Sequence, residues 1–383
     1  MSQSIKVRPA AFLRTTLPLG IDMLESYDSG RYHSIWLPDH MVSFWPDSIW
    51  TPEFTDLATA SPSPHRHLDG MAVAAAAAVL TSRTQLATCV IDTVRRHPSL
   101  LAQSALTIDH LSKGRFILGL GSGELENTVP YGFDFRKPVS RFEESLKVIK
   151  LLWESDRPVD FEGEFYHLEH ARLDTELYDG KCPPIWIGAA GPRMLGITGR
   201  YADGWWPAGA YTPEDYAAKL KVILNAGDAA GRDMSGFVPA ITQISIVGEE
   251  DEVEEMLATP MVKSIILMLT ARDLEQFGYH HPMGPDWRGI IDFDPVKLSR
   301  DKIIRFCDEV DTQAIRDIFP VGTPSEVARS FKGMADAGMR VFKVLDYGGM
   351  AGLKYGARSA EKVRQVEDEV LRLCGELAGG EGA

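Results

Sequence analysis

The sequence predicts a (β/α)8 barrel, an α/β fold in which eight parallel strands alternate with helices around one closed sheet. Short apolar runs alternate with longer amphipathic segments from about residue 5 to about residue 345, which is the pattern of a parallel α/β protein. The apolar runs number eight, as a closed barrel requires. A glycine-rich turn follows the fourth run, whereas an open doubly wound sheet carries that turn after its first strand. We therefore favour the closed barrel over the open sheet.

The predicted strands are short and are bounded by glycine, proline or polar residues. They cover residues 7–12, 34–37, 86–91, 115–120, 184–188, 204–207, 241–247 and 341–345. We expect them to form one barrel domain that spans residues 1–383.

Helix ends between these strands are marked by caps and by glycine. Residues 98–111 have helical periodicity and stop before Gly114. Three helix starts are predicted from a hydroxyl-bearing cap followed by glutamate or proline: Ser140 with Glu143, Thr212 before Pro213, and Thr323 before Pro324.

Two stretches, 46–67 and 272–299, have no clean period. The first is rich in proline and serine, and the second carries more aromatic residues. Long irregular loops inside a compact fold are usually functional or disordered. The first stretch closely follows His40, and the second falls between the seventh and eighth predicted strands. We expect both insertions to lie over the carboxyl-terminal face of the barrel.

The composition is that of a folded globular protein whose partners are small molecules. Of the 383 residues, 44% are hydrophobic and 25% are charged, and the formal net charge is −14. This charge repels nucleic acid and anionic membranes, so neither is expected as a partner. The four cysteines, at 89, 182, 307 and 374, lie far apart and indicate neither a disulfide framework nor a metal site. The longest apolar run, 71–80, is too short to cross a bilayer, and we expect a cytoplasmic protein.

Four of the predicted strand ends carry unusual residues, and in a barrel of this kind the catalytic groups lie at the carboxyl ends of the strands. The four ends are Asp39-His40 after the second strand, "CVIDTVRRHP" after the third, "GLGSGELEN" after the fourth and "IGAAGPRML" after the fifth. Each end also has a purely structural explanation. The histidine could simply have its hydrogen bonds satisfied within the fold, the charges could be solvated, and the glycines and the proline could form a tight turn or an ordinary helix start. Their coincidence at one rim favours a binding site, because exposed backbone amides at a helix start bind phosphate.

Two further features could lie on the same rim. The pair Arg95 and Arg96 could receive an anionic cofactor tail in a chain this acidic, or it could stay solvated. The stretch "GWWPAGAY" contains Trp205 and Trp206, which could form an apolar wall for a substrate or divide between core and rim.

Several motifs, taken in order, resemble the luciferase-like monooxygenase superfamily: "PDH", "LSKGRFILGLGSGE", "IWIGAAGPRMLGITGRYADGWW" and "VGTPSEVARSF". The resemblance spans about residues 10–350 and implies a TIM barrel of the bacterial luciferase type that binds FMN or the deazaflavin coenzyme F420. The stretches "RRHPSLLAQSALTIDHLSKGRFILGLGSGELEN", "PYGFDFRKPVSRFEE" and "HHPMG" look most like the F420-dependent branch, in particular its phthiodiolone ketoreductase type.

The resemblance also implies which residues form the site. In the F420-dependent sugar-phosphate dehydrogenases of the superfamily, an Asp-His pair contacts the deazaflavin and the histidine transfers a proton; these positions fall on Asp39 and His40. A non-proline cis peptide behind the coenzyme ring would fall at Cys89-Val90, with Asp92 just beyond. Other coenzyme contacts would fall on Gly121, Ser122, Gly123, Asn127, Gly191, Pro192, Met194 and Leu195. Glu124 would be a second proton carrier or a coenzyme ligand.

Two departures from those dehydrogenases concern the substrate. Their tryptophan four residues after the histidine is Phe44 here, with Trp45 one place later. Their polar, lysine-bearing stretch that holds a sugar phosphate is replaced by "WWPAGAY". We therefore expect Phe44, Trp45, Trp205 and Trp206 to contact a hydrophobic, lipid-like substrate and not a sugar phosphate.

The predicted activity is hydride transfer between F420 and a ketone or secondary alcohol. A proton must move at the substrate oxygen in the same event, and His40 would carry it while Asp39 orients and polarises the imidazole. The alternatives are an FMN-dependent two-component monooxygenase and a barrel that binds a flavin or lipid without turnover. The superfamily commonly forms dimers, so a homodimer is expected.

Overall fold

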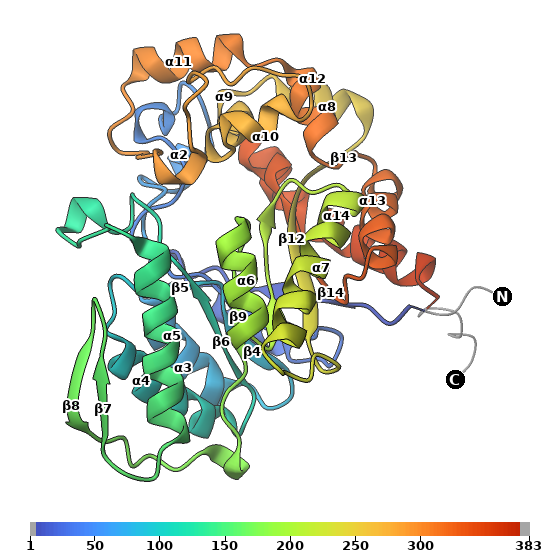
Figure 1. Ribbon diagram of the computed structural model, residues 1–383. Coiled ribbons are helices and arrows are strands. Elements are labelled where there is room, and N and C mark those ends of the chain that lie inside the picture. The colour runs from blue at the N-terminus through green and yellow to red at the C-terminus, as the bar shows by residue number, and fades with distance from the viewer. Residues whose placement is uncertain (1–4, 376–383) are drawn as a thin grey trace.

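A parallel sheet of short strands forms the centre of the molecule (Figure 1). In the computed structural model, which describes residues 5–375, the strands follow one another around this sheet in chain order. The barrel strands are β1 (Arg8–Pro9) with β2 (Ala11–Phe12), β3 (Ser34–Leu37), β4 (Gln85–Thr88), β6 (Phe116–Gly121), β9 (Ile185–Ile187), β10 (Gly204–Trp205), β12 (Val238–Val247) and β14 (Val341–Asp346). Each overlaps one of the eight predicted runs, which confirms the (β/α)8 barrel.

The first predicted strand closes the barrel. Its two halves have different partners, because β1 pairs with β14 and β2 pairs with β3. Between them, the backbone N–H of Ala10 donates to the carbonyl of Phe342 at 2.7 Å. One short segment therefore bonds to both the last strand and the second strand, and it joins the two edges of the sheet.

The third predicted strand is interrupted, because β4 ends at Thr88 and does not run on to residue 91. The Thr88 hydroxyl accepts from the N–H of Gly119 and donates to its carbonyl, each at 2.9 Å. A Cβ atom at Gly119 would lie 1.8 Å from the carbonyl oxygen of Thr88, so only glycine permits this approach. The chain then bulges at Cys89-Val90, a cis peptide, and returns as β5 (Ile91–Asp92), which pairs with the end of β6.

The sixth predicted strand is also split, since β10 is followed by β11 (Ala208–Gly209) after a break at Pro207. Proline has no N–H to donate to the ladder. Both short pieces pair with β12.

Long helices pack around the barrel (Figure 1). They are α3 (Gly70–Leu80), α4 (Pro98–Ser112), α5 (Pro138–Glu154), α6 (Pro192–Tyr201), α7 (Pro213–Ala229), α13 (Pro324–Asp336) and α14 (Leu353–Leu373). The caps predicted at Thr212 and Thr323 are confirmed, because each hydroxyl accepts a backbone N–H of the first turn. The cap predicted at Ser140 is wrong. The helix begins earlier, at Pro138, whose fixed φ suits a first turn, and the Ser140 hydroxyl accepts from Arg193.

Shorter elements connect these. They are η1 (Ile21–Met23), α1 (Leu24–Tyr27), η3 (Val129–Tyr131), η4 (Tyr178–Gly180), η7 (Tyr347–Ala351) and an antiparallel hairpin of β7 (Val159–Glu162) and β8 (His167–Ala171). The hairpin lies beside α5 on the outside of the barrel (Figure 1).

A largely helical excursion separates β12 from β14. It contains α8 (Glu250–Leu257), α9 (Pro260–Lys263), η5 (Ser264–Met268), α10 (Ala271–Glu275), η6 (Gly289–Ile291), α11 (Arg300–Glu309), α12 (Thr312–Ile318) and β13 (Val321–Gly322). The insertion predicted over 272–299 is thus correctly placed between the seventh and eighth strands, but it is longer and more helical than expected.

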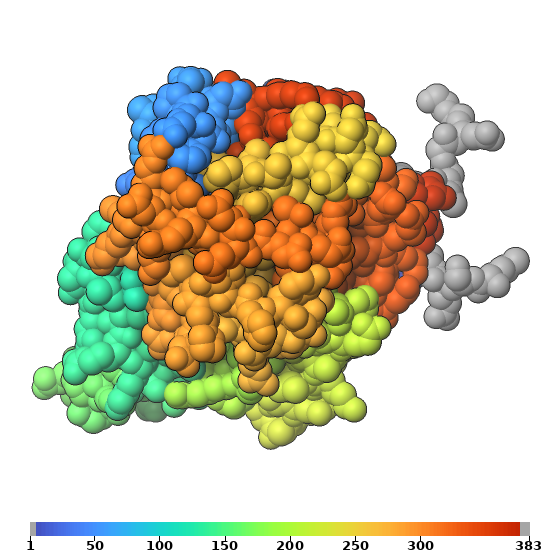
Figure 2. Space-filling view, turned by 90° about the horizontal axis from the view of Figure 1, so that it is seen from above, coloured from blue at the N-terminus to red at the C-terminus, as the bar shows by residue number. Residues whose placement is uncertain are grey.

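The loop at 46–67 lies next to this excursion and contains η2 (Asp47–Ile49) and α2 (Leu57–Ala60). Figure 2 shows the two segments together, in blue and in yellow to orange, over the face above the barrel. The insertions therefore cover the carboxyl-terminal face, as predicted.

Three apolar clusters hold this arrangement together. The largest lies between the barrel and its helices. A second fills the barrel interior and includes Trp36, Trp186 and Trp206. A third lies within the excursion, and the fully buried Ile49 joins the 46–67 loop to it. None of the helices of residues 5–375 has the length and hydropathy needed to cross a membrane.

Candidate active site

His40 lies just beyond the carboxyl end of β3, and its side chain is 17% exposed. The ring of Phe44 meets the imidazole edge-on, with 5.2 Å between the ring centroids. The polar partners of His40 come from the loop after β6, where Asn127 Nδ2 is 3.0 Å and Glu124 Oε2 is 3.4 Å from its Nδ1. The structure therefore brings together three of the predicted site residues from two strand ends.

The orientation of the Asn127 amide is fixed by backbone donors. Its Oδ1 accepts from the N–H groups of Met41 and Val42, at 2.6 and 3.2 Å. The Nδ2 group must then face His40, and an amide nitrogen can only donate. In the neutral imidazole, Nδ1 is consequently the acceptor and Nε2 carries the hydrogen. The chain presents His40 with a transferable proton on the ring nitrogen that points away from Asn127.

Glu126 joins this group, although the sequence analysis did not single it out. Its side chain is buried, and its Oε1 lies 3.0 Å from Asn127 Nδ2. One atom each of His40, Glu124 and Glu126 lies within 4.8 Å of the other two. Burial, followed by the nearby Glu124 carboxylate, raises the pKa of Glu126 to about 10, so this carboxyl keeps its proton at neutral pH.

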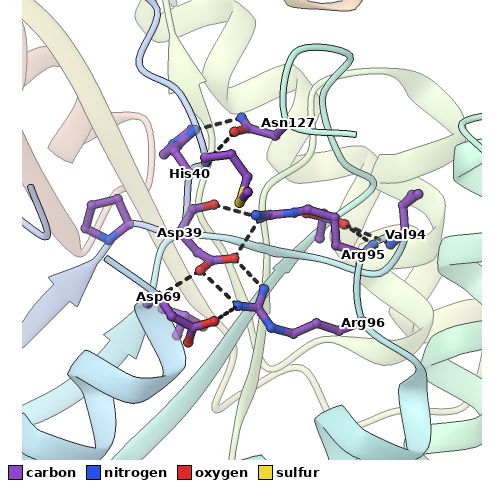
Figure 3. Close-up of polar contacts among 12 residues, drawn as sticks. Asp39, His40, Asp69, Val94, Arg95, Arg96 and Asn127 are labelled. Atoms are coloured by element: carbon purple, nitrogen blue, oxygen red, sulfur yellow. Dashed lines mark hydrogen bonds and ion pairs between the residues drawn. The ribbon is translucent and has the colours of Figure 1, made fainter. Parts of the chain in front are cut away.

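Asp39 faces away from His40, which corrects the prediction that it orients the imidazole (Figure 3). Its carboxylate accepts from the backbone N–H of Gly70 at 2.8 Å and forms ion pairs with Arg95 and Arg96. Burial raises the pKa of Asp39, but the hydrogen bonds and charges of Arg96 and Arg95 outweigh burial and lower it below its ordinary value. Asp39 is a buried structural anchor, and Asn127 takes the orienting role.

Arg95 and Arg96 are engaged within the protein, which corrects the hypothesis that they receive an anionic cofactor tail. Arg95 pairs with Asp39 and Asp92, and its side chain is only 8% exposed. Arg96 pairs with Asp39 and also with Asp69 at 2.6 Å (Figure 3). Three carboxylates neutralise these two guanidinium groups, so little positive charge is left for a ligand.

Asp92, predicted to contact the coenzyme, likewise has all its partners within the protein. Its Oδ1 accepts from the N–H groups of Val94 and Arg95, at 2.9 and 2.7 Å. Its Oδ2 pairs with the Arg95 side chain. The carboxylate shapes the turn after β5 and is 5% exposed.

The glycine turn after β6 and the start of α6 lie side by side, because β6 and β9 are paired neighbours. Gly121 packs so closely on Val90 that a Cβ atom would lie 2.7 Å from Val90 Cγ2. Gly123 has a φ of 91°, which L side chains rarely adopt. At the start of α6, a Cβ atom on Gly191 would meet nothing within 4 Å. The open backbone at this helix N-terminus fits a phosphate group.

The side chains that follow Gly191 do not face this opening. Met194 and Leu195, both predicted as coenzyme contacts, are buried in the largest core cluster. They can contribute to a ligand site only through the backbone. Pro192 occupies the first helical position and leaves no N–H unpaired there.

Trp205 and Trp206 are buried, which corrects the prediction that they form a wall for the substrate. Trp205 is fully buried, stacks on Tyr216 and donates to the carbonyl of Ala189 at 2.8 Å. Trp206 is 4% exposed in the barrel interior and donates to the hydroxyl of Thr242 at 2.7 Å. They are neighbours in the sequence at the end of β10, and they point into different cores.

Phe44 and Trp45 are the aromatic residues that remain near His40. Both are partly buried against the cluster of the helical excursion. Trp45 packs on Tyr347, with 4.8 Å between the ring centroids. The aromatic residues of 277–287 also pack within this cluster; Trp287, for example, donates to the carbonyl of Leu267.

The loop at 46–67 is tied to the segment that follows His40. The backbone N–H of Ser43 donates to His65 Nδ1 at 3.0 Å, and the Ser43 hydroxyl lies 2.8 Å from His67 Nε2. The imidazole of His67 is 5.6 Å from that of His40, and burial lowers the pKa of His67 to about 3. His67 is therefore neutral and adds no charge beside His40.

Comparison with known proteins agrees with this fold. The model of the luciferase-like monooxygenase family matches residues 22–340. The phthiodiolone/phenolphthiodiolone dimycocerosates ketoreductase of Mycobacterium tuberculosis is 36% identical over 337 residues, which cover 86% of this chain and 87% of the relative. The F420-dependent glucose-6-phosphate dehydrogenase of Kineococcus radiotolerans is 31% identical over 304 residues, which cover 76% and 80%.

Among solved structures, an F420-dependent secondary alcohol dehydrogenase in complex with an F420-acetone adduct superposes with a TM-score of 0.69. The two chains are 20% identical, and the match covers 94% of this chain and 99% of that one.

Proposed function

The chain belongs to the luciferase-like monooxygenase family, and we propose that it is an F420-dependent oxidoreductase acting on a ketone or secondary alcohol. The observation that carries the proposal is His40 itself. It lies at a barrel strand end, its Nδ1 is held by Asn127, and its Nε2 carries the hydrogen. This is the arrangement that donation of a proton to a carbonyl oxygen requires.

The deazaflavin would supply or accept a hydride as one two-electron unit when bound. The residues that would hold it are the bulge at Cys89-Val90, the turn of Gly121 to Gly123 and the start of α6 at Gly191. The fit rests on the close backbone approaches at the turn and on the open helix N-terminus, which suits a phosphate. Of the two relatives described above, one is named as a ketoreductase and the other as an F420-dependent dehydrogenase.

The residues of this chain then have separate tasks. In the reduction direction, His40 Nε2 gives its proton to the substrate oxygen while the hydride reaches the carbon. Asn127 keeps the imidazole in the tautomer that can do so. Glu124, 25% exposed and 3.4 Å from His40 Nδ1, lies where the ring must take up a proton as it gives up the one on Nε2.

We infer that the substrate is hydrophobic. Phe44 packs against the imidazole, and Trp45 lies next to it in sequence. The relative at 36% identity is named for a dimycocerosate ketone. With Trp205 and Trp206 buried, the apolar contacts near His40 come from the 41–45 segment and the excursion above it.

The test is a side-by-side titration of the protein with F420 and with FMN, followed by turnover assays. We expect F420 to bind about 100-fold more tightly than FMN, a difference of about 2.7 kcal/mol. With reduced F420 bound, a long-chain ketone should be reduced, and with oxidised F420 bound, glucose 6-phosphate should not be oxidised. Tight FMN binding without F420 affinity would contradict the proposed coenzyme, and turnover of the sugar phosphate would contradict the hydrophobic substrate.

A further inference from the structure

A cavity of about 180 Å³ lies behind the His40 cluster, on the side of Glu126. Its lining includes Val42, Glu126, Tyr131, Asp294, Val296 and Lys297. Tyr131 and Val296 are 43% and 52% exposed, so the outer wall of the cavity reaches the protein surface. Because a water molecule occupies about 30 Å³ of liquid, the cavity can hold several waters.

Glu126 is the residue shared by the cavity and the His40 cluster. It lines the cavity, yet its Oε1 lies 3.0 Å from Asn127 Nδ2, the same nitrogen that contacts His40. Its Oε2 is buried and has no hydrogen-bond partner among the residues the structure describes. A buried carboxyl oxygen without a partner is costly unless it is protonated or meets water.

The hydrogen-bond count of the cluster requires an additional proton. Asn127 Nδ2 is within 3.0 Å of His40 Nδ1, Glu124 Oε2 and Glu126 Oε1. The amide has only two hydrogens and cannot be flipped, because Met41 and Val42 donate to its oxygen. The two hydrogens of Asn127 can serve only two of these three acceptors. The third is satisfied when either Glu124 or Glu126 carries a proton of its own.

We propose that Glu126 is a proton relay that connects the waters of this cavity to His40 through Glu124. The proposal rests on the proposed function, in which His40 protonates the substrate oxygen. It supplies a route that enters from the surface beside Tyr131 and Val296. Such a route can return protons to the His40 cluster while coenzyme and substrate occupy the site.

The protons balance over one reduction. Glu126 gives its proton to Glu124 and Glu124 gives one to His40 Nδ1 as Nε2 releases its proton to the substrate oxygen, so the imidazole stays neutral and becomes the Nδ1–H tautomer. Hydronium in the cavity returns a proton to Glu126. After the product leaves, Nε2 takes a proton from solvent and Nδ1 gives its proton back along the relay, which restores the starting tautomer. In the oxidation direction each transfer is reversed. Asp294 and Lys297, which form an ion pair at the outer part of the cavity, carry no net charge that would repel the entering proton.

The decisive variant is Glu126→Gln, which keeps the shape and hydrogen bonds of the side chain but removes its transferable proton. With reduced F420 and a ketone, we expect turnover to fall by about 10- to 100-fold, with coenzyme affinity changed by less than about threefold. Added imidazole, which fits the cavity, should restore part of the lost turnover in the variant and leave the wild type unchanged. A merely structural role would be satisfied by glutamine and would show no rescue. Turnover within about twofold of wild type would overturn the relay.

A bulky side chain at the outer wall of the cavity tests this route without altering the His40 cluster. Val296→Trp should close the outer wall and lower turnover as Glu126→Gln does, while Val79→Trp is the matched control on the outside of α3. Both valines are exposed, at 52% and 63%, so neither change should unfold the protein. Normal turnover in Val296→Trp would contradict entry of protons through this cavity.

Infrared difference spectroscopy separates failure of the relay from failure of the proposed function. At neutral pH the wild type should show a carboxylic acid C=O band that Glu126→Gln lacks, whether or not F420 binds. Absence of that band would overturn the relay on its own. If the band were present but the protein failed to bind F420, the conclusion that Glu126 is protonated would stand and the proposed coenzyme would be wrong.

Discussion

At the scale of the residue, the chemistry of this protein depends on which atom of His40 carries a proton. Asn127 settles this, because its amide is held by two backbone donors and can only donate toward Nδ1. The carboxyl groups of Glu124 and Glu126 also lie 3.0 Å from the nitrogen of this amide. In the proposed function, the nitrogen that gives up the proton is therefore set by Asn127.

His40→Ala should lower turnover by about 100- to 10,000-fold, because the substrate oxygen loses its acid, while F420 affinity stays within an order of magnitude. Steady-state kinetics with a ketone and a binding titration check this. His167→Ala, at an exposed histidine of β8, is the control and should be unaffected. Wild-type turnover in His40→Ala from about pH 5 to about pH 9 would assign the proton to another group or to water.

Asp39→Asn should act on stability more than on catalysis. Removing one partner of a buried ion pair costs about 3 kcal/mol, because Arg95 and Arg96 lose their shared carboxylate. Since the pKa of Asp39 is lowered in the folded protein, its contribution is present above the ordinary pKa and is lost as the pH falls through the folded value. Urea unfolding at pH 7 and near pH 3 should show a smaller deficit at the lower pH, and an equal deficit at both would contradict the ion-pair account.

Glu126→Gln should change the pH dependence of stability in the opposite sense. The pKa of Glu126 is raised to about 10, so the folded protein binds one more proton than the unfolded chain between the ordinary pKa and that value. This term makes the wild type lose about 1.4 kcal/mol for each unit of rising pH, and glutamine removes it. Unfolding curves at pH 5 and pH 8 should show Glu126→Gln gaining on the wild type at the higher pH.

Single residues show where sequence reasoning reached its limit. His40, Glu124 and Asn127 were placed at one site because strand ends of a barrel must meet. Adjacency to His40 could not reveal that Asp39 points the other way, since that direction depends on Arg95 and Arg96 from another strand end. Glu126 gave no signal, because an acidic residue beside a glycine turn is normally solvated.

At the scale of the element, the contact between β4 and β6 shapes the side of the site where we propose that the coenzyme binds. Thr88 bonds to Gly119 through its hydroxyl, the chain leaves the ladder at Cys89, and Val90 is placed against Gly121. The bulge thus follows from one threonine and two glycines. Sequence patterns predicted a continuous strand over 86–91, because "LATCVI" is largely apolar and gives no local sign of the break.

Gly119→Ala should therefore destabilise the barrel by about 3 kcal/mol, since its methyl group would overlap the carbonyl of Thr88. It should also weaken F420 binding by displacing the bulge. Gly191→Ala is the matched control, because nothing lies within 4 Å of the added Cβ and its backbone is extended. If urea unfolding gave the two variants the same free energy of unfolding, β4 and β6 would be able to move apart and accommodate the added methyl group.

The helices and loops were predictable to different degrees. Thr212 and Thr323 were recognised because a hydroxyl cap before proline is a local signal. The β7–β8 hairpin was not, since its strands are short and largely exposed. The excursion was underestimated because its outer helices are amphipathic like those of the barrel, so composition did not separate them.

At the scale of the whole molecule, the 46–67 loop and the helical excursion between β12 and β14 share one apolar cluster, although they are far apart in the sequence. Ile49 from the 46–67 loop is fully buried in the cluster of the excursion that includes Phe293. The covering of the carboxyl-terminal face therefore behaves as one body that is distinct from the core around the barrel.

Ile49→Ala should loosen this covering and leave the barrel intact. Truncation of a fully buried isoleucine costs about 2–5 kcal/mol, and here the cost should appear as faster amide hydrogen exchange in 44–60 and 261–310. Exchange in β6 and β12 should be unchanged. If exchange accelerated equally in the barrel strands, the two clusters would form one cooperative unit.

The closure of the barrel by β1 and β2 affects how a nascent chain can fold on the ribosome. The partner strand of β1 is β14, which is made only after the rest of the barrel has left the exit tunnel. Until then, β1 and β12 each present an unpaired edge, and such edges pair readily with other chains. Synthesis interrupted before β14 should consequently yield aggregating fragments, and holdase chaperones that shield strand edges should be most valuable in the last part of translation.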